Sequence, residues 1–175
     1  EALQQIRPGD RIFIGTGCAT PVSLLRKLES LRRPPSGVQL IHFLLDGDLP
    51  EVYGEGTSRF LHKVFFVGQN CRELLKAGLA EYIPISLSDV PGLFRSRGIP
   101  IDVAIVQVTP PDKGGMCSLG VSVDATLSAL ECADRVIGEV NPAMPRTCGE
   151  TLVPLSRFDA IVGVDAPVTE YVHTP

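Results

Sequence analysis

Residues 102–145 read DVAIVQVTPPDKGGMCSLGVSVDATLSALECADRVIGEVNPAMP. In this segment an apolar strand pattern leads into a loop rich in proline and glycine, then a helix pattern, a second strand pattern and a second loop flanked by prolines. Two parallel strands joined in this way place the loops that follow them at the same edge of the sheet, where open α/β sheets bind ligands. We therefore expect a ligand crevice between these two loops.

The same alternation of strand and helix patterns extends through the rest of the chain. Apolar strand patterns cover residues 11–14, 38–45, 63–67, 101–108, 135–140 and 158–164. Helix patterns cover residues 21–31, 70–77 and 121–133, and a short helical turn follows Ser88. This alternation predicts an α/β fold, an open, mostly parallel sheet with helices on both faces. Residues 46–59 are polar and aperiodic, which is typical of a functional or mobile loop.

Composition excludes several classes of protein. The chain has 175 residues, 44% of them hydrophobic, which predicts one compact domain over residues 1–175. Its net charge of −4 is spread without a basic stripe, which argues against nucleic acid as a partner. No apolar run approaches the roughly 20 residues of a membrane span, and residues 1–10 lack the pattern of a signal peptide. We therefore expect a cytoplasmic protein with no membrane partner.

Cysteine and histidine usage gives no sign of metal or disulfide chemistry. The five cysteines form no C-x-x-C pair, which argues against a disulfide framework and a structural zinc site. His42, His62 and His173 are far apart in the sequence, and no serine or cysteine nucleophile is arranged with them. Neither a metal site nor a catalytic triad is expected.

A glycine loop, Gly15-Thr16-Gly17-Cys18-Ala19-Thr20, lies between the first strand pattern and the first helix pattern. Thr20 is expected to cap that helix, with Pro21 at the first helical position. The spacing, together with Asp46, is similar to a dinucleotide-binding loop, but Thr20 stands where the third glycine is required. More generally, N–H groups at a helix start suit a carboxylate, a phosphate or a developing oxyanion. The alternative is a plain turn of small residues.

The two later loops, residues 109–120 and 141–146, are stiffened by proline. Glycines in the first of them would let the backbone approach a ligand closely. Asp112 and Lys113 are either ligand contacts or solvated turn residues, and the amide of Asn141 would either orient a substrate or cap a neighbouring loop. Glu139 and Glu150 are the carboxylates nearest the second loop, and a strand-end or surface role fits them better than that of a nucleophile.

In combination, these loops and three other motifs resemble the amino-terminal half of the acetyl-CoA hydrolase/transferase family, which includes the 4-hydroxybutyrate and acetate CoA-transferases. The matching motifs are Gly15-x-Gly-x-x-Thr-Pro21, Phe65-Phe66-Val67-Gly68, Tyr82-Ile83-Pro84-Ile85-x-Leu-x-Asp-Val-Pro91, Pro-Pro-Asp112, Gly115-Met-Cys-Ser-Leu-Gly-Val-Ser122 and Val140-Asn-Pro-Ala-Met-Pro145, with Asp159 and residues 165–170 agreeing as well.

The resemblance implies two similar α/β halves that face each other across an active site. In such enzymes a glutamate of the carboxyl-terminal half attacks the acyl-CoA thioester, and the CoA thiolate then forms a glutamyl-CoA thioester that a carboxylate or water resolves. The implied substrates are acyl-CoA (a coenzyme A thioester) and a small carboxylate, with no bound cofactor. The implied partners are the carboxyl-terminal half of the same protein and further copies in a homo-oligomer. A chain that begins at Glu1 and ends at Pro175 is expected to be an excised piece, inactive alone and without a catalytic residue.

The resemblance also indicates which residues line the acyl and carboxylate site. They belong to three loops: Gly15, Thr16, Gly17 and Pro21; Asp112, Gly115, Ser118 and Gly120; and Asn141, Met144 and Pro145. Some family members carry a histidine near the position of Thr16 and Cys18, so the acceptor is not indicated. Two other interpretations remain: a non-catalytic module that binds a nucleotide or another anion, and a scaffolding pseudoenzyme half that pairs with another chain.

Overall fold

The computed structural model describes residues 1–45, 53–54, 57–58 and 60–171. Asp46, His173 and most of the loop predicted at residues 46–59 therefore lie outside the described residues. Within the described part, Tyr53–Gly54 (β3) and Thr57–Ser58 (β4) pair as a short antiparallel ladder.

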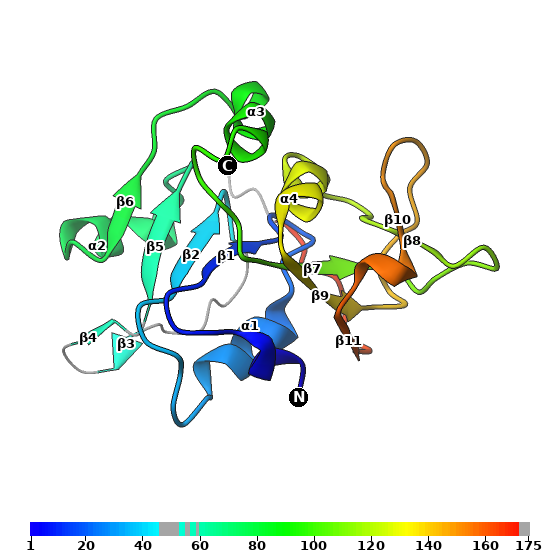
Figure 1. Ribbon diagram of the computed structural model, residues 1–175, viewed down its shortest axis with the longest axis horizontal. Coiled ribbons are helices and arrows are strands. Elements are labelled where there is room, and N and C mark those ends of the chain that lie inside the picture. The colour runs from blue at the N-terminus through cyan, green and yellow to red at the C-terminus, as the bar shows by residue number, and fades with distance from the viewer. Residues whose placement is uncertain (46–52, 55–56, 59, 172–175) are drawn as a thin grey trace.

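Seven parallel strands form the central sheet, in the order β11-β9-β7-β1-β2-β5-β6 (Figure 1). Their bounds are Arg11–Ile14 (β1), Gln39–His42 (β2), Leu61–Val64 (β5), Ala80–Tyr82 (β6), Val103–Val108 (β7), Arg135–Val140 (β9) and Ala160–Gly163 (β11). The chain builds β1, β2, β5 and β6 outward in one direction, then returns to place β7, β9 and β11 on the other side of β1. This reversal creates the crevice at the carboxyl ends of the strands where open α/β sheets bind ligands.

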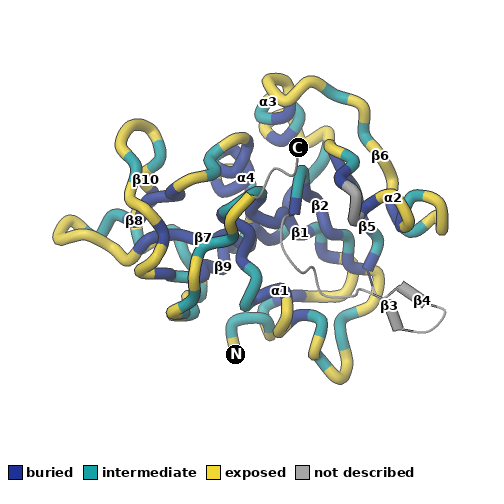
Figure 2. Tube along the Cα trace, turned by 180° about the vertical axis from the view of Figure 1, so that it is seen from behind, coloured by how far each residue is buried: buried dark blue, intermediate teal, exposed yellow. Residues whose placement is uncertain are grey.

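Helices cover both faces of the sheet, as predicted. The helices are Val22–Glu29 (α1), Gln69–Lys76 (α2), Val90–Arg95 (α3) and Thr126–Cys132 (α4), with 3-10 turns at Ala2–Gln5 (η1), Leu87–Asp89 (η2) and Leu155–Arg157 (η3). In Figure 1, α1 lies below the sheet and α3 and α4 lie above it. Every residue of β7 is buried, because alternate side chains enter the core on the α1 face and the core on the α3–α4 face. Figure 2 shows this buried centre, with exposed residues in loops, on helix surfaces and on the edge strands β6 and β11.

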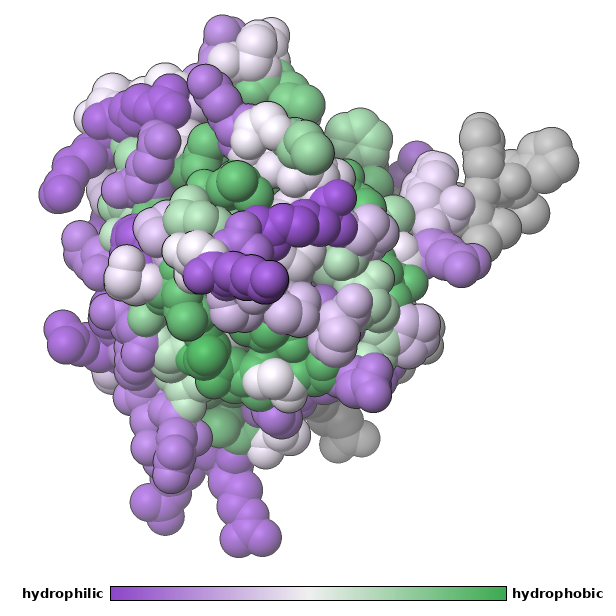
Figure 3. Space-filling model, turned by 90° about the vertical axis from the view of Figure 1, so that its right-hand side faces the viewer, coloured by the Kyte–Doolittle hydropathy of each residue, from purple (hydrophilic) through white to green (hydrophobic). Residues whose placement is uncertain are grey.

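Strand boundaries follow the predicted patterns closely at β1 and β9 and less closely elsewhere. The sequence missed β6, which is a three-residue edge strand, and missed the antiparallel pair of Met116–Ser118 (β8) and Leu152–Pro154 (β10). The helix predicted from residue 121 begins only at Thr126, because Asp124 adopts a positive φ of 29° and interrupts helical backbone. Figure 3 faces the end of the molecule with β8, β10 and β11, where hydrophobic surface lies among long hydrophilic side chains.

Candidate active site

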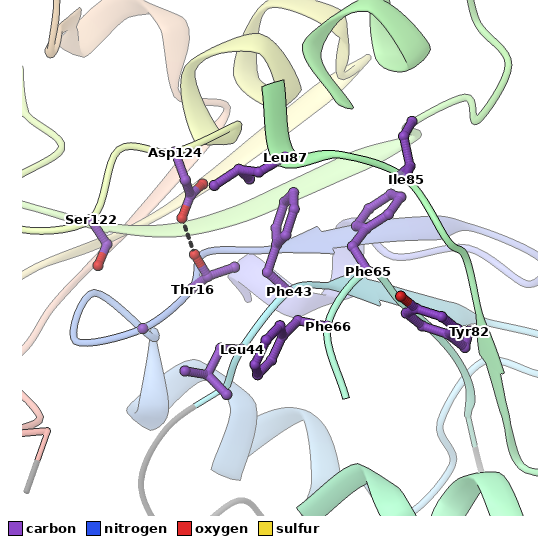
Figure 4. Close-up of a pocket in the computed structure, with 11 residues that line it drawn as sticks. Thr16, Phe43, Leu44, Phe65, Phe66, Tyr82, Ile85, Leu87, Ser122 and Asp124 are labelled. Atoms are coloured by element: carbon purple, nitrogen blue, oxygen red, sulfur yellow. Dashed lines mark hydrogen bonds between the residues drawn. The ribbon is translucent and has the colours of Figure 1, made fainter. Parts of the chain in front are cut away.

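A cavity of about 490 Å³ opens at the carboxyl ends of β1, β2, β5 and β6 (Figure 4). The lining residues come from the loops after these strands and from the segment before α4. They are Thr16, Gly17, Phe43, Leu44, Phe65, Phe66, Tyr82, Ile85, Leu87, Ser122 and Asp124. The volume is within the range of small-molecule sites, about 300–1,000 Å³, and the position is the crevice that the fold predicts.

Aromatic side chains form much of the wall of this cavity. Phe43 follows β2, Phe65 and Phe66 follow β5, and Tyr82 ends β6. The rings of Phe43 and Phe65 lie 4.8 Å apart, and Phe65 also contacts Phe94 of α3 edge-on, which anchors this wall in the core. By contrast, Phe66 and Tyr82 are 56% and 50% exposed. Large apolar side chains that remain exposed around a hollow are typical of a binding site.

The polar side of the cavity joins the glycine loop to the segment before α4. The Thr16 hydroxyl donates a hydrogen bond to the Asp124 carboxylate (Figure 4). The other oxygen of Asp124 accepts from the N–H and the hydroxyl of Thr126, each at 3.0 Å. Gly17 has a positive φ of 57°, and a Cβ there would lie 2.9 Å from the Ser122 hydroxyl, so only glycine fits without a shift. The two loops therefore hold each other in one arrangement.

The glycine loop does not present the helix start to a ligand as the sequence suggested. Its N–H groups at Gly15, Gly17 and Thr20 donate to carbonyls of the protein. The prediction that Thr20 caps α1 is wrong, because the Thr20 hydroxyl donates to the Gly17 carbonyl at 2.6 Å and the helix begins only at Val22.

A carboxylate from the sheet occupies the start of α1 instead. Glu139, in β9, is only 1% exposed and accepts the N–H of Leu24 at 2.8 Å and the side-chain amide of Gln107 at 3.1 Å. Burial raises the pKa of Glu139, and the bonds from Leu24, Ser23 and Gln107 oppose that shift. A surface role for Glu139 is therefore wrong: an internal carboxylate satisfies the N–H groups and the dipole of the helix.

Asn141, Met144 and Gly120 contact other parts of the protein. Asn141 is buried, and its amide donates to Gln107 at 3.2 Å and to the carbonyl of Ala166 at 2.9 Å. The sequence left two roles open for this amide, to orient a substrate or to cap a neighbouring loop. These bonds are of the capping kind. A Cβ on Gly120 would overlap the Met144 sulfur and lie 3.2 Å from the Pro145 carbonyl. The glycines of this loop were expected to let the backbone approach a ligand closely. At Gly120 the group that packs closely against the backbone is the side chain of Met144.

The Asp112 loop lies on the β8–β10 side of the fold, and Asp112 orders it. Its carboxylate accepts the N–H groups of Gly114 and Met116 at 2.8 and 2.9 Å and pairs with Arg146 at 2.5 Å. These backbone bonds, with the Arg146 charge, lower the pKa of Asp112. Gly115 completes this turn with a φ of 76°. Ser118, in β8, is buried and bonds Thr147.

Of the predicted site residues, the structure therefore gathers Thr16 and Gly17 at the cavity, beside Gly15 and Pro21 of the same loop. Asp112, Gly115, Ser118, Gly120, Asn141, Met144 and Pro145 are not among its lining residues. Sequence reasoning missed Asp124 and the aromatic wall as site residues. The sequence placed the phenylalanines inside the strand patterns 38–45 and 63–67, and only the structure, in which β2 ends at His42 and β5 at Val64, places them in the loops that follow.

Other chemistries find little support in the part of the chain that the structure describes. It contains no group of three or more His, Cys, Asp or Glu side chains that could hold a metal ion. None of its helices is long and apolar enough to cross a membrane. Cys117 is buried, and this burial raises the pKa of its thiol, which disfavours a nucleophilic thiolate.

Comparison with known proteins assigns this architecture to a family. The model of the acetyl-CoA hydrolase/transferase N-terminal domain matches residues 1–173. A 4-hydroxybutyrate coenzyme A transferase of Clostridium kluyveri is 37% identical over 97% of this chain and 40% of its own length. A succinyl-CoA:acetate/propanoyl-CoA:succinate CoA transferase of Fasciola hepatica is 34% identical over 100% of this chain and 37% of its own. The chain thus spans about two fifths of these relatives.

Solved structures agree with this assignment. RipA from Yersinia pestis superposes with a TM-score of 0.88 at 28% identity, over 99% of this chain and 43% of that one. A 4-hydroxybutyrate CoA-transferase from Porphyromonas gingivalis superposes with a TM-score of 0.73 at 32% identity, over 98% of this chain and 40% of that one. The sequence motifs, the sheet order and these matches lead to one conclusion: the chain belongs to the acetyl-CoA hydrolase/transferase family and corresponds to its amino-terminal domain.

Proposed function

We propose that this domain forms one wall of the site for acyl-CoA and a small carboxylate in an acyl-CoA:carboxylate CoA-transferase or acetyl-CoA hydrolase. One observation carries the proposal: four motifs that resemble the family, separated in sequence, converge on one cavity. Thr16 and Gly17 come from the first motif, Phe65 and Phe66 from the second, and Tyr82 from the third. Ser122, which ends the motif Gly115-Met-Cys-Ser-Leu-Gly-Val-Ser122, also lines the cavity.

Among the described residues, the carboxylates in or near the cavity loops do not suit nucleophilic attack, which supports a nucleophile on a carboxyl-terminal half. Asp124 lines the cavity, but both of its oxygens accept hydrogen bonds from threonines. Glu139 is buried beneath α1 and bonded at both oxygens. Glu150 is exposed and is not among the lining residues. The proposed nucleophile is a glutamate that the second half places against this wall.

In the proposed reaction, that glutamate attacks the thioester carbonyl and expels CoA thiolate, which leaves an acyl-glutamyl anhydride. The thiolate then attacks the glutamyl carbonyl, releases the acyl group as a free carboxylate and forms a glutamyl-CoA thioester. An acceptor carboxylate reverses these two steps and leaves as the new acyl-CoA. In a hydrolase, water attacks instead. The role of the present domain is to orient the thioester and exclude bulk water.

The nucleotide-binding alternative has less support from the structure. A phosphate site at α1 would need free N–H groups at the helix start. Glu139 already accepts the N–H of Leu24, and Gly15, Gly17 and Thr20 donate within the protein. Binding of a phosphate there would require displacement of a buried carboxylate.

The test is CoA transfer from acetyl-CoA to a panel of short carboxylates, measured side by side for residues 1–175 and for a longer polypeptide that contains this domain and a family carboxyl-terminal half. Transfer or thioester hydrolysis by the longer polypeptide alone is expected. Turnover by residues 1–175 would refute the placement of the nucleophile and return attention to Glu139 and Glu150. Absence of turnover in both, with saturable nucleotide binding, would favour the binding module.

A further inference from the structure

We propose that the cavity receives the acyl group of the thioester and that Asp124 makes it selective for uncharged acyl groups over those that end in a carboxylate. The inference rests on the proposed function and deepens it, because it names the substrate class that this wall admits.

The first argument is the composition of the cavity. Of the eleven described residues that line it, eight are apolar, aromatic or glycine, and among these eight only Tyr82 carries a hydroxyl: Gly17, Phe43, Leu44, Phe65, Phe66, Tyr82, Ile85 and Leu87. No lysine, arginine or histidine is among the lining residues that the structure describes. A second carboxylate, at the far end of the acyl chain, would lose water and gain no cationic partner from these residues, which is costly for an ion. Methyl and methylene groups would gain from the same walls.

The second argument is the charge of Asp124, which is the one acidic residue in the described part of the cavity lining. Its hydrogen-bond donors are the Thr16 hydroxyl and the N–H and hydroxyl of Thr126, all of them neutral groups. These bonds hold the carboxylate in the cavity wall, and none of these donors carries a positive charge that would neutralise it. Since apolar walls weaken screening, a second carboxylate in the cavity would meet strong repulsion.

The third argument is size. A volume of about 490 Å³ exceeds what an acetyl group fills and leaves room for a short chain next to the thioester. Each buried methylene contributes about 0.8 kcal/mol, a factor of roughly four in kcat/KM. Butyryl has two more methylenes than acetyl, so we expect kcat/KM to rise about fifteenfold from acetyl-CoA to butyryl-CoA, and to be at least tenfold lower for succinyl-CoA than for butyryl-CoA.

The test uses the longer polypeptide that contains this domain. Acetyl-CoA, butyryl-CoA and succinyl-CoA are supplied separately with saturating propanoate, and propanoyl-CoA is measured by chromatography. Asp124→Asn removes the charge and keeps the shape, because asparagine tolerates a positive φ and its amide can still bond Thr16 and Thr126. We expect this variant to raise the ratio of kcat/KM for succinyl-CoA to kcat/KM for butyryl-CoA about tenfold. Asp134→Asn is the matched control, since it removes one charge from an exposed residue outside the cavity.

A second variant tests the apolar wall. Phe66→Ala truncates a side chain that is 56% exposed, so the fold should tolerate it. It should lower the preference for butyryl-CoA over acetyl-CoA about fivefold, whereas Leu152→Ala on the β8–β10 pair should leave it unchanged.

The outcomes separate this inference from the function on which it rests. If all three thioesters are used equally, or if Asp124→Asn and Asp134→Asn shift the butyryl-to-succinyl ratio alike, the selectivity is refuted while the transferase function stands. No transfer from any thioester would refute the proposed function and the selectivity together.

Discussion

Glu139 shows how much of this site depends on a single buried side chain. Its position in the strand pattern RVIGEV indicates only a polar residue near a strand end. Its partner Leu24 is 115 residues away in sequence, and the bond between them replaces the threonine cap that local rules predict. The sequence could not identify this contact, because capping rules consider neighbours along the chain and not strands that arrive from elsewhere.

Replacement of Glu139 by glutamine tests this role. One oxygen remains an acceptor, but the new NH2 group must face either the N–H of Leu24 or the amide of Gln107, so a donor meets a donor. We expect the free energy of unfolding to fall by about 1–3 kcal/mol, measured by urea denaturation. Glu131→Gln is the control, because that residue forms a half-exposed ion pair with Arg95 whose loss should cost at most about 1 kcal/mol. Equal losses in the two variants would contradict the capping role.

The longer strands and helices could be predicted from their apolar patterns, whereas the short strands that lie within loops could not. Apolar runs predicted β1, β7 and β9, in which all residues are buried except the partly buried first residue of β1 and the two end residues of β9. The strand β8 lies within a loop that the sequence identifies only by its prolines and glycines. It forms because β10, more than 30 residues later, supplies its antiparallel partner. A three-residue strand has no period of its own to detect.

The contact between Gly120 and Met144 joins the two proline-stiffened loops, and Gly120→Ala tests it. Alanine there adopts a φ of 71° and its Cβ overlaps the Met144 sulfur, so we expect the free energy of unfolding to fall by about 2–4 kcal/mol. Gly78→Ala is a matched control, since Gly78 has the same φ of 71° but no atom within 4 Å of the added Cβ. It should cost only about 1 kcal/mol, measured by the same denaturation.

A second change separates the clash from backbone strain. Addition of Met144→Ala to Gly120→Ala removes the overlapping sulfur and should recover part of the lost stability, as a double-mutant cycle would show. Additive effects of the two changes would mean that the loops are not coupled through this contact.

For the whole molecule, the sequence predicted the fold and the edge of the sheet that carries the site, but not how the site is built. Parallel strands force the loops after β1, β2, β5 and β6 to one edge. Which strands become neighbours is set by tertiary packing, and this order brings Phe43, Phe65 and Tyr82 around one cavity. The sequence favoured the loops after β7 and β9 as the ligand site, but these loops lie on the other side of the reversal point in the strand order. From this part of the chain, the lining residues that the structure describes are Ser122 and Asp124, in the segment that leads to α4.

The same strand order brings together two histidines that seemed unrelated in sequence. His42 and His62, on the neighbouring strands β2 and β5, are 0% and 2% exposed, and His42 Nε2 lies 3.0 Å from His62 Nδ1. Burial, with the neighbouring His62, lowers the pKa of His42 from 6.5 to about 3, and burial lowers that of His62 to about 4. The fold therefore requires both rings to be neutral.

Acid should consequently destabilise the whole domain through this pair. Each folded-state pKa lies below the unfolded value of 6.5, so the stability is present above pH 6.5 and is lost as the pH falls toward 4 and 3. Between pH 7 and pH 5 each ring should cost about 2 kcal/mol, because only the unfolded chain takes up the proton. Urea denaturation at the two pH values should show this loss, and His62→Gln should remove about half of it, since one titrating ring remains. If the free energy of unfolding falls equally in the variant and the original protein between pH 7 and pH 5, other groups cause the acid sensitivity. A smaller fall in His62→Gln over this pH range would identify the buried imidazoles as its source.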